Sequence, residues 1–251
     1  MKMKRLIKLN NMKACKFQAA DGEIGTFADI FIDDSCFAIR FFSVNTINWL
    51  PKRKVLLSPF TVGAVDEQNQ LVSIELAQQQ IKNSPPLGTD QPISRRYEEK
   101  YFTYYDWPPY WDNLSWPNTF HHQTSAIANH RPDRDIAPHS ENHLHRANRI
   151  LGYDIIVADG KIGQLKDFIL DTHYWVIRFL EIDTHICLDN TNSALVPPTA
   201  ILGINWPDRR ITVDLNREIL QNAPTHNANE PISKEYETQL LKYYNEEIFR
   251  K

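Results

Sequence analysis

The sequence predicts a mainly β protein made of two tandem small β-barrels, each followed by a C-terminal amphipathic helix. Three observations carry this prediction: an internal repeat, many short β-branched and aromatic segments bounded by turn residues, and a tyrosine-rich helical stripe that closes each copy. The length of 251 residues suffices for two domains of ordinary size.

The repeat is clearest in the hexapeptides ADGEIG and ADGKIG, which begin at Ala20 and Ala158. The match continues through residues 29–46, which align with residues 167–184. After an adjustment of one residue, it extends to the end of each copy. A match over some ninety residues indicates tandem duplication.

The segment between the copies, residues 112–148, is rich in Pro, Asn, His and Ser and lacks apolar periodicity. About 37 residues is long for a loop inside one compact domain. We therefore expect a first domain at 1–111, a linker at 112–148 and a second domain at 149–251.

The Asp-Gly pair in each hexapeptide lies between two apolar runs and predicts a β-hairpin, because glycine adopts positive φ without steric cost. The glycine three residues later predicts a bulge or a close backbone approach. The predicted turn residues are Asp21, Gly22, Gly25, Asp159, Gly160 and Gly163. A phosphate-binding loop is the alternative, although neither GxGxxG nor GxxxxGK[ST] spacing is present.

The strand segments FAIRFFSV and WVIRFLEI follow the hairpins, and each copy ends in a predicted helix. Ser94 and Ser233 are placed to act as helix N-caps. Tyrosine and leucine then recur at i, i+4, i+7 and i+8 and form one apolar stripe. We expect this stripe to dock on a barrel; a surface for a partner is the alternative.

Two long segments of the first copy, DGEIGTFADIFIDDSCFAIRFFSVNTINWLPKRKVLLSP and IKNSPPLGTDQPISRRYEEKYFTYYDWPPYW, resemble the PRC-barrel domain. The segment NHLHRANRILGYDIIVADGKIG resembles the entry to a second such domain. The family includes the photosynthetic reaction-centre H subunit, a 16S rRNA maturation factor and many bacterial proteins of unassigned function. The resemblance implies two PRC-type barrels and protein–protein contact as the working mode.

The two copies differ at one corner and at the C-terminal end. The Trp-Leu-Pro corner and basic run at 49–54 have no counterpart in the second copy, and DWPPYW at 106–111 is replaced by NEEIFR. Interfaces favour Trp, Tyr and Arg, so we expect a partner-binding surface here. Its predicted residues are Trp49, Leu50, Lys52, Arg53, Trp107, Tyr110 and Trp111. The alternative is that these aromatic residues seal the barrel.

Motifs for catalysis or for a cofactor are not found. The sequence has no nucleophile elbow and no catalytic cysteine signature, and its three cysteines lie among apolar neighbours. Arg40 and Arg178 lie inside apolar strands and need partners, for which the aspartates four residues apart at the strand ends are candidates. Linker histidines are a weak alternative metal site: His121, His122, His143 and His145.

The net charge of -3 argues against direct nucleic-acid binding, which usually needs a basic excess. The sequence has no run of about 18 apolar residues, so it does not predict a transmembrane helix. The basic N-terminus lacks an apolar signal-peptide core, so we expect a cytoplasmic protein; peripheral contact with anionic lipid is the alternative. We expect a protein partner, which the sequence does not identify. That partner can be a second copy of the chain, which would give a homo-oligomer.

The sequence therefore favours a non-catalytic protein-interaction or scaffold protein without a cofactor. Two alternatives stay open. One is a small-ligand-binding protein or an unrecognised enzyme with its site at the barrel–barrel interface, and the other is a ribosome-associated factor by family analogy.

Overall fold

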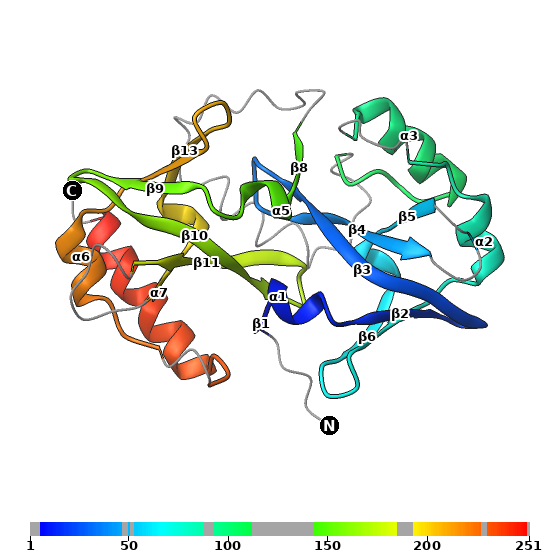
Figure 1. Cartoon of the computed structure of the whole chain (residues 1–251), viewed down its shortest axis with the longest axis horizontal. Helices are drawn as coiled ribbons and strands as arrows, with labels where there is room; N and C mark the ends of the chain where they lie inside the picture. The colour runs from blue at the N-terminus through cyan, green and yellow to red at the C-terminus, as the bar shows by residue number, and fades with distance from the viewer. Residues whose placement is uncertain are drawn as a thin grey trace. The chain divides into compact units, whose positions relative to one another are not determined.

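The computed structural model describes the chain at 6–46, 50, 53–87, 93–111, 143–184, 193–226 and 230–249. It is mainly β, with two seven-stranded sheets and a few helices (Figure 1). The chain divides into two compact units, which are described separately. The first holds the described part of Asn10–Arg149 with Thr172–Val176, and the second holds that of Lys4–Leu9, Ile150–Asp171 and Ile177–Lys251.

The sheet of the first unit has the strand order β5-β4-β3-β2-β7-β6, and β8 pairs with β3 off this path. The long strand β3 is antiparallel to β2 and β4, whereas β2 and β7 are parallel. The strands are β2 (Lys16–Ala19), β3 (Gly22–Asp33), β4 (Ile39–Thr46), β5 (Arg53–Leu57), β6 (Val62–Asp66), β7 (Leu71–Ile74) and β8 (Leu144–Arg146). Helices α2 (Gln78–Asn83) and α3 (Arg95–Tyr104) follow the sheet.

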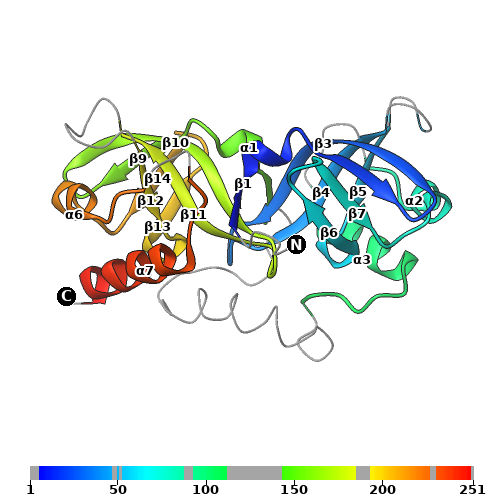
Figure 2. The same cartoon turned by 90° about the horizontal axis from the view of Figure 1, so that it is seen from below.

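The sheet of the second unit repeats this order as β12-β11-β10-β9-β14-β13, with β1 pairing with β10. Its strands are β1 (Leu6–Lys8), β9 (Asp154–Val157), β10 (Gly160–Asp171), β11 (Val176–Asp183), β12 (Ser193–Val196), β13 (Ile201–Asn205) and β14 (Arg210–Val213). Helix α6 (Arg217–Asn222) precedes α7 (Lys234–Phe249), which lies beside this sheet (Figure 2). The common strand order matches the duplication seen in the sequence.

Each sheet takes its seventh strand from a segment that precedes the other copy in the chain. Strand β1 precedes the first copy, yet Leu6 pairs with Asp171 in the second sheet. Strand β8 precedes the second copy, yet Leu144 pairs with Asp33 in the first sheet. The short helices α1 (Leu9–Met12) and α5 (Ala147–Ile150) follow these two strands. Sequence analysis did not predict this exchange, because the two strands are only three residues long.

The duplicated hexapeptides form the β2–β3 and β9–β10 hairpins. In each hairpin the register shifts near the second glycine, which marks a bulge. A Cβ atom on Gly25 would lie 1.9 Å from the carbonyl oxygen of Asn45, and one on Gly163 would lie 2.0 Å from that of Asp183. These glycines therefore permit the close approach of two backbones.

The aspartates of the hexapeptides have a second role, which the sequence did not suggest. A carboxylate oxygen of Asp21 accepts a hydrogen bond of 2.8 Å from the backbone N–H of Gln78, the first residue of α2. Asp159 accepts the equivalent bond, of 3.0 Å, from Arg217 at the start of α6. Each Asp-Gly turn thus satisfies one free donor at a helix start.

The expected closed barrels are not what the strand pairing shows. Within the described residues, each path runs from one open edge to the other, and no pairing joins β5 to β6. The side chain of Tyr101 occupies the end of β5 instead: its hydroxyl lies 3.2 Å from the carbonyl oxygen of Leu56 and 3.2 Å from the amide nitrogen of Ser58. A helix side chain therefore satisfies backbone groups at this edge.

Candidate functional site

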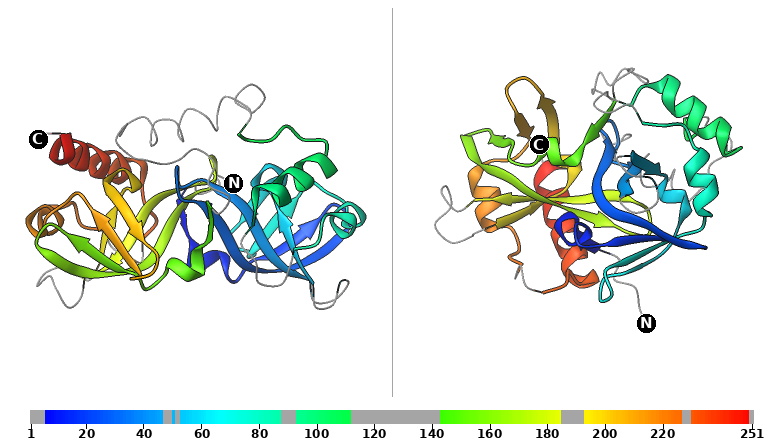
Figure 3. Two further views of the ribbon diagram at one scale, coloured as in Figure 1. Left: turned by 90° about the horizontal axis from the view of Figure 1, so that it is seen from above. Right: turned by 45° about the vertical axis from the view of Figure 1, so that its right-hand side comes forward.

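Helix α3 ends in a tail that folds back on the first unit, and this tail builds the candidate site. Asp106 adopts a φ of 54°, which turns the chain out of the helix. The N–H of Trp107 then donates a 3.0 Å hydrogen bond to the carbonyl oxygen of Phe102. Two prolines follow, so the helix cannot continue. Figure 3 shows the tail leaving the end of α3.

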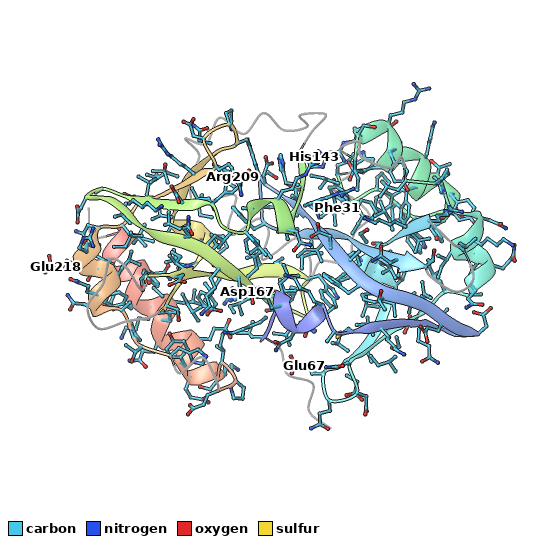
Figure 4. All side chains as sticks on the ribbon, in the orientation of Figure 1. Phe31, Glu67, His143, Asp167, Arg209 and Glu218 are labelled. Atoms are coloured by element: carbon cyan, nitrogen blue, oxygen red, sulfur yellow. The ribbon has the colours of Figure 1, made fainter. Side chains whose placement is uncertain are left out.

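Tyr110 in this tail connects two titratable side chains in a buried polar cluster. Its hydroxyl donates a 2.6 Å hydrogen bond to Oε1 of Glu98 and lies 2.7 Å from Nε2 of His143. Arg95 adds an ion pair of 3.1 Å to Oε2 of Glu98. Glu98 is fully buried, and Tyr110 and His143 are nearly so. Figure 4 labels His143 at the entry to β8 and Phe31 on the neighbouring strand β3.

A second ion pair, between Arg40 and Asp33, packs against the ring of Tyr110. The guanidinium of Arg40 lies 3.7 Å from the centre of this ring and donates bonds of 3.0 and 2.9 Å to Oδ2 of Asp33. Ser35 bonds the other carboxylate oxygen of Asp33. The sequence predicted an aspartate partner for Arg40, and for this arginine that prediction is confirmed.

The electrostatics of the two buried carboxyl groups differ. Burial of Glu98 raises its pKa to about 7, although the hydrogen bond from Tyr110 and the charges of Arg95 and Arg40 act in the opposite direction. Burial alone would raise the pKa of Asp33 as well, but Arg40 and Ser35 hold it below its ordinary value. Near neutral pH, Glu98 is therefore the carboxyl group of the cluster that exchanges a proton.

In the second unit, the arginine that corresponds to Arg40 has a different partner. Nε of Arg178, aligned with Arg40, lies 2.6 Å from Oε1 of Glu237, which is aligned with Glu98. This partner is not one of the strand-end aspartates that the sequence suggested for Arg178. Helix α7 runs on through residue 246, which is aligned with Trp107, and so this copy has no tail that inserts a tyrosine between arginine and glutamate.

An aromatic strip lies beside the tail, with two exposed rings and two rings that are partly buried against the core of the first unit. It consists of Phe60, Trp107, Tyr105 and Tyr104. The rings of Tyr105 and Trp107 stack at 4.4 Å with 13° between their planes, and Phe60 follows at 5.7 Å from Trp107. Phe60 is 43% exposed and Tyr104 is 39% exposed. In the second copy, Thr199 and Glu246 stand at the positions of Phe60 and Trp107.

The predicted partner-binding residues lie in different environments. Trp107 belongs to the aromatic strip, whereas Tyr110 is buried, and Trp111 lies with its ring 4.0 Å from the guanidinium of Arg95. Arg53 donates bonds to the carbonyl oxygens of residues 82 and 84. Leu50 is partly buried, and its carbonyl oxygen accepts a 2.7 Å bond from Thr46. Trp49 and Lys52 lie outside the described residues.

The weak metal hypothesis finds no support in the histidines that the structure describes. Nε2 of His143 faces Tyr110, and Nε2 of His145 lies 2.9 Å from a carboxylate oxygen of Asp34. Over the described parts of the chain, no group of three or more His, Cys, Asp or Glu residues is arranged to hold a metal ion. His121 and His122 fall outside these parts.

A small hollow in the second unit is lined by residues of β1, β10, β11, β12, α6 and α7 and of the segment that follows α6. The buried carboxylate of Glu181 is part of this lining and lies 2.8 Å from Nζ of Lys8. Nζ of Lys166 lies 3.0 Å from the same carboxylate. Burial would raise the pKa of Glu181, but the two lysines lower it below its ordinary value. The two neighbouring cations therefore keep this carboxylate ionised.

Comparisons with known proteins do not identify the chain. Neither protein-family models nor curated proteins give a match. In the described residues, none of the helices has the length and apolar character needed to cross a membrane.

Sequence reasoning missed the central role of Glu98 and the contribution of Phe60. Nothing local in the sequence distinguishes Glu98 from its neighbour Glu99. One signal was available: Glu98 aligns with Glu237 in the second copy, while Glu99 aligns with Thr238. An acid repeated at the same place in two helices is a candidate for burial against the repeated arginine.

Proposed function

We propose that the chain is a non-catalytic protein-interaction or scaffold protein built from two PRC-barrel-like modules, which acts in the cytoplasm. The aromatic strip of the first unit is the single observation that carries this proposal. The likeness of both copies to PRC-barrel sequences, and their common strand order, support it.

The strip has the properties of a binding surface. Single exposed apolar residues are common on proteins, but four contiguous rings, two of them more than one-third exposed, are not. Tyr and Trp supply large, rigid contact areas at low entropic cost, and they are enriched at interfaces. Tyr104 is also held in place, because its hydroxyl donates a 2.8 Å bond to the carbonyl oxygen of Gln80. We infer that the partner presents an apolar protein segment to these rings.

Site-specific photo-crosslinking tests this proposal. A crosslinking amino acid at position 60 is expected to capture a discrete protein from extracts of the source cell, and Trp107→Ala is expected to abolish that product. The matched control is position 202, because Leu202 on β13 of the second unit is 46% exposed and lies outside the strip.

Three results are informative. Equal products from positions 60 and 202, or products that survive Trp107→Ala, would contradict the proposal. A crosslink between two copies of the chain would identify the partner as a second copy. Thermal unfolding of Trp107→Ala shows whether a lost product reflects lost folding instead.

A further inference from the structure

One hydroxyl group in the tail of the first unit, that of Tyr110, contacts two titratable side chains. A tyrosine hydroxyl has one proton to donate. The hydroxyl oxygen lies 2.6 Å from Oε1 of Glu98 and 2.7 Å from Nε2 of His143. Nε2 of His143 also lies 3.4 Å from Oε2 of Glu98 and 3.4 Å from a guanidinium nitrogen of Arg95. The three groups therefore form one connected cluster, in which Tyr110 joins the tail to α3 and to the segment before β8.

The charges around Glu98 come from every segment packed against it. Arg95 lies one turn earlier on its own helix, His143 precedes β8, and Asp33 and Arg40 act from β3 and β4. Two guanidinium groups favour the carboxylate. Its side chain is nevertheless fully buried, and an ionised carboxylate there has lost its hydration.

We propose that Glu98, Tyr110 and His143 form a proton-operated latch, which fastens residues 106–111 to α3 while Glu98 is protonated and loosens them when Glu98 is ionised. Trp107 belongs to these residues, so loosening would dismantle the aromatic strip and weaken partner binding. This second consequence rests on the proposed function, whereas the latch itself does not.

The direction follows from linkage between proton binding and closure. In an open state Glu98 would be hydrated and would have an ordinary carboxyl pKa, whereas burial in the closed state raises its pKa to about 7. The closed state therefore binds the proton more tightly, and protonation stabilises closure. As the pH rises through about 7, this stabilisation is lost and the tail opens more often.

The fold supplies a hinge and an internal reporter for this motion. Asp106 has a φ of 54°, a conformation that non-glycine residues rarely hold, and it lies where the tail leaves the helix. The N–H of Trp107 bonds the carbonyl oxygen of Phe102 at 3.0 Å, so its exchange with solvent reports closure. Residues 108 and 109 are prolines and have no amide hydrogen.

Amide hydrogen exchange of the full chain at pH 6.0 and 8.5, corrected for intrinsic rates, tests the latch. The Trp107 amide is expected to exchange about tenfold faster at the higher pH. Glu98→Gln keeps a hydrogen-bonding side chain without a charge, and it is expected to abolish this difference and keep exchange slow. Glu237→Gln, the aligned change in the second unit, is the matched control and should leave the difference intact.

Tyr110→Phe removes only the hydroxyl and keeps the ring against Arg40, so it is expected to speed exchange at both pH values. Equal exchange at the two pH values in the unmodified chain, or a pH response that survives Glu98→Gln, would overturn the latch. The crosslinking of Trp107→Ala at pH 6.0 tests the proposed function separately, because it does not depend on how the tail responds to pH.

Discussion

The two units share a strand order but differ in how their last helix ends and in what their equivalent arginine and glutamate contact. Helix α7 continues to Phe249, and Glu237 on it pairs directly with Arg178. Helix α3 stops at Tyr104, and its tail brings a tyrosine between the corresponding arginine and glutamate. The two copies therefore have the same hairpins but differ at residues 106–111 and the aligned residues 245–250. The first unit has a hydrogen-bonded cluster and an aromatic strip where the second has the direct Arg178–Glu237 ion pair.

Substitution of the hairpin glycines tests the feature that the two units share. It is expected to cause the largest loss of stability. Gly25→Ala and Gly163→Ala should each destabilise their own unit by about 4 kcal/mol, because the new Cβ would collide with a backbone carbonyl oxygen. Chemical denaturation with unit-specific hydrogen exchange measures this loss. Gly152→Ala is the control: its φ is 80°, and an added Cβ would meet no atom within 4 Å. An equal loss of stability in this variant would show that backbone strain, and not a collision, causes the loss.

The exchanged strands test the boundary between the units. Leu6 and Leu144 are both buried and occupy aligned positions in β1 and β8. Truncation to alanine should cost about 3 kcal/mol at each site. Leu6→Ala should speed amide exchange in β10 of the second unit, and Leu144→Ala should speed it in β3 of the first. Faster exchange in the unit that each leucine precedes in the chain would refute the strand exchange.

The two aligned glutamates test the difference between the units directly. At pH 8, Glu237→Gln should destabilise the second unit by about 2 kcal/mol, because it leaves the charge of Arg178 without its partner. Glu98→Gln should leave the first unit as stable as before or slightly more stable, because it removes a buried ionised group. Denaturant unfolding of the two variants compares these effects, and equal losses would mean that the two environments do not differ.

The pH dependence of stability is the next effect in size. Since the pKa of Glu98 is raised in the folded state, its proton stabilises the first unit at low pH, and this contribution is lost as the pH rises toward about 7. The expected slope is at most about 1.4 kcal/mol per pH unit, between about pH 5 and 7. Unfolding of the unmodified chain is compared with that of Glu98→Gln over this range, and parallel profiles would exclude a role for Glu98.

The smallest effect is expected at the surface. Phe60→Ala should change the free energy of unfolding by less than about 0.5 kcal/mol, because its ring is 43% exposed. The variant should nevertheless give less of the crosslinked product when the crosslinking amino acid is placed at position 104. A large loss of stability would show that the ring supports the fold of the first unit rather than binding.

Much of the fold could be predicted, because it depends on residues that are close in the sequence. The Asp-Gly hairpins lie where the repeat predicted them, and the hydroxyls of Ser94 and Ser233 accept bonds from Tyr97 and Tyr236 as N-caps. The candidate site could be predicted only in part. Trp107 and Tyr110 were predicted as partner-binding residues, Glu98 was not among the predicted site residues, and His143 was predicted only as a weak alternative metal ligand.

By itself the sequence determined the duplication, the mainly β class, the turns, the caps and the break after α3, since each follows from the steric and hydrogen-bonding preferences of a few adjacent residues. Only the tertiary structure decided that the paths of the sheets stay open, that β1 and β8 exchange places, and that Glu98 meets Tyr110 and His143. The physical reason is burial: the pKa of Glu98 and the contacts of Tyr110 depend on side chains up to about 70 residues away in the sequence. No local pattern records which of these side chains will be buried together.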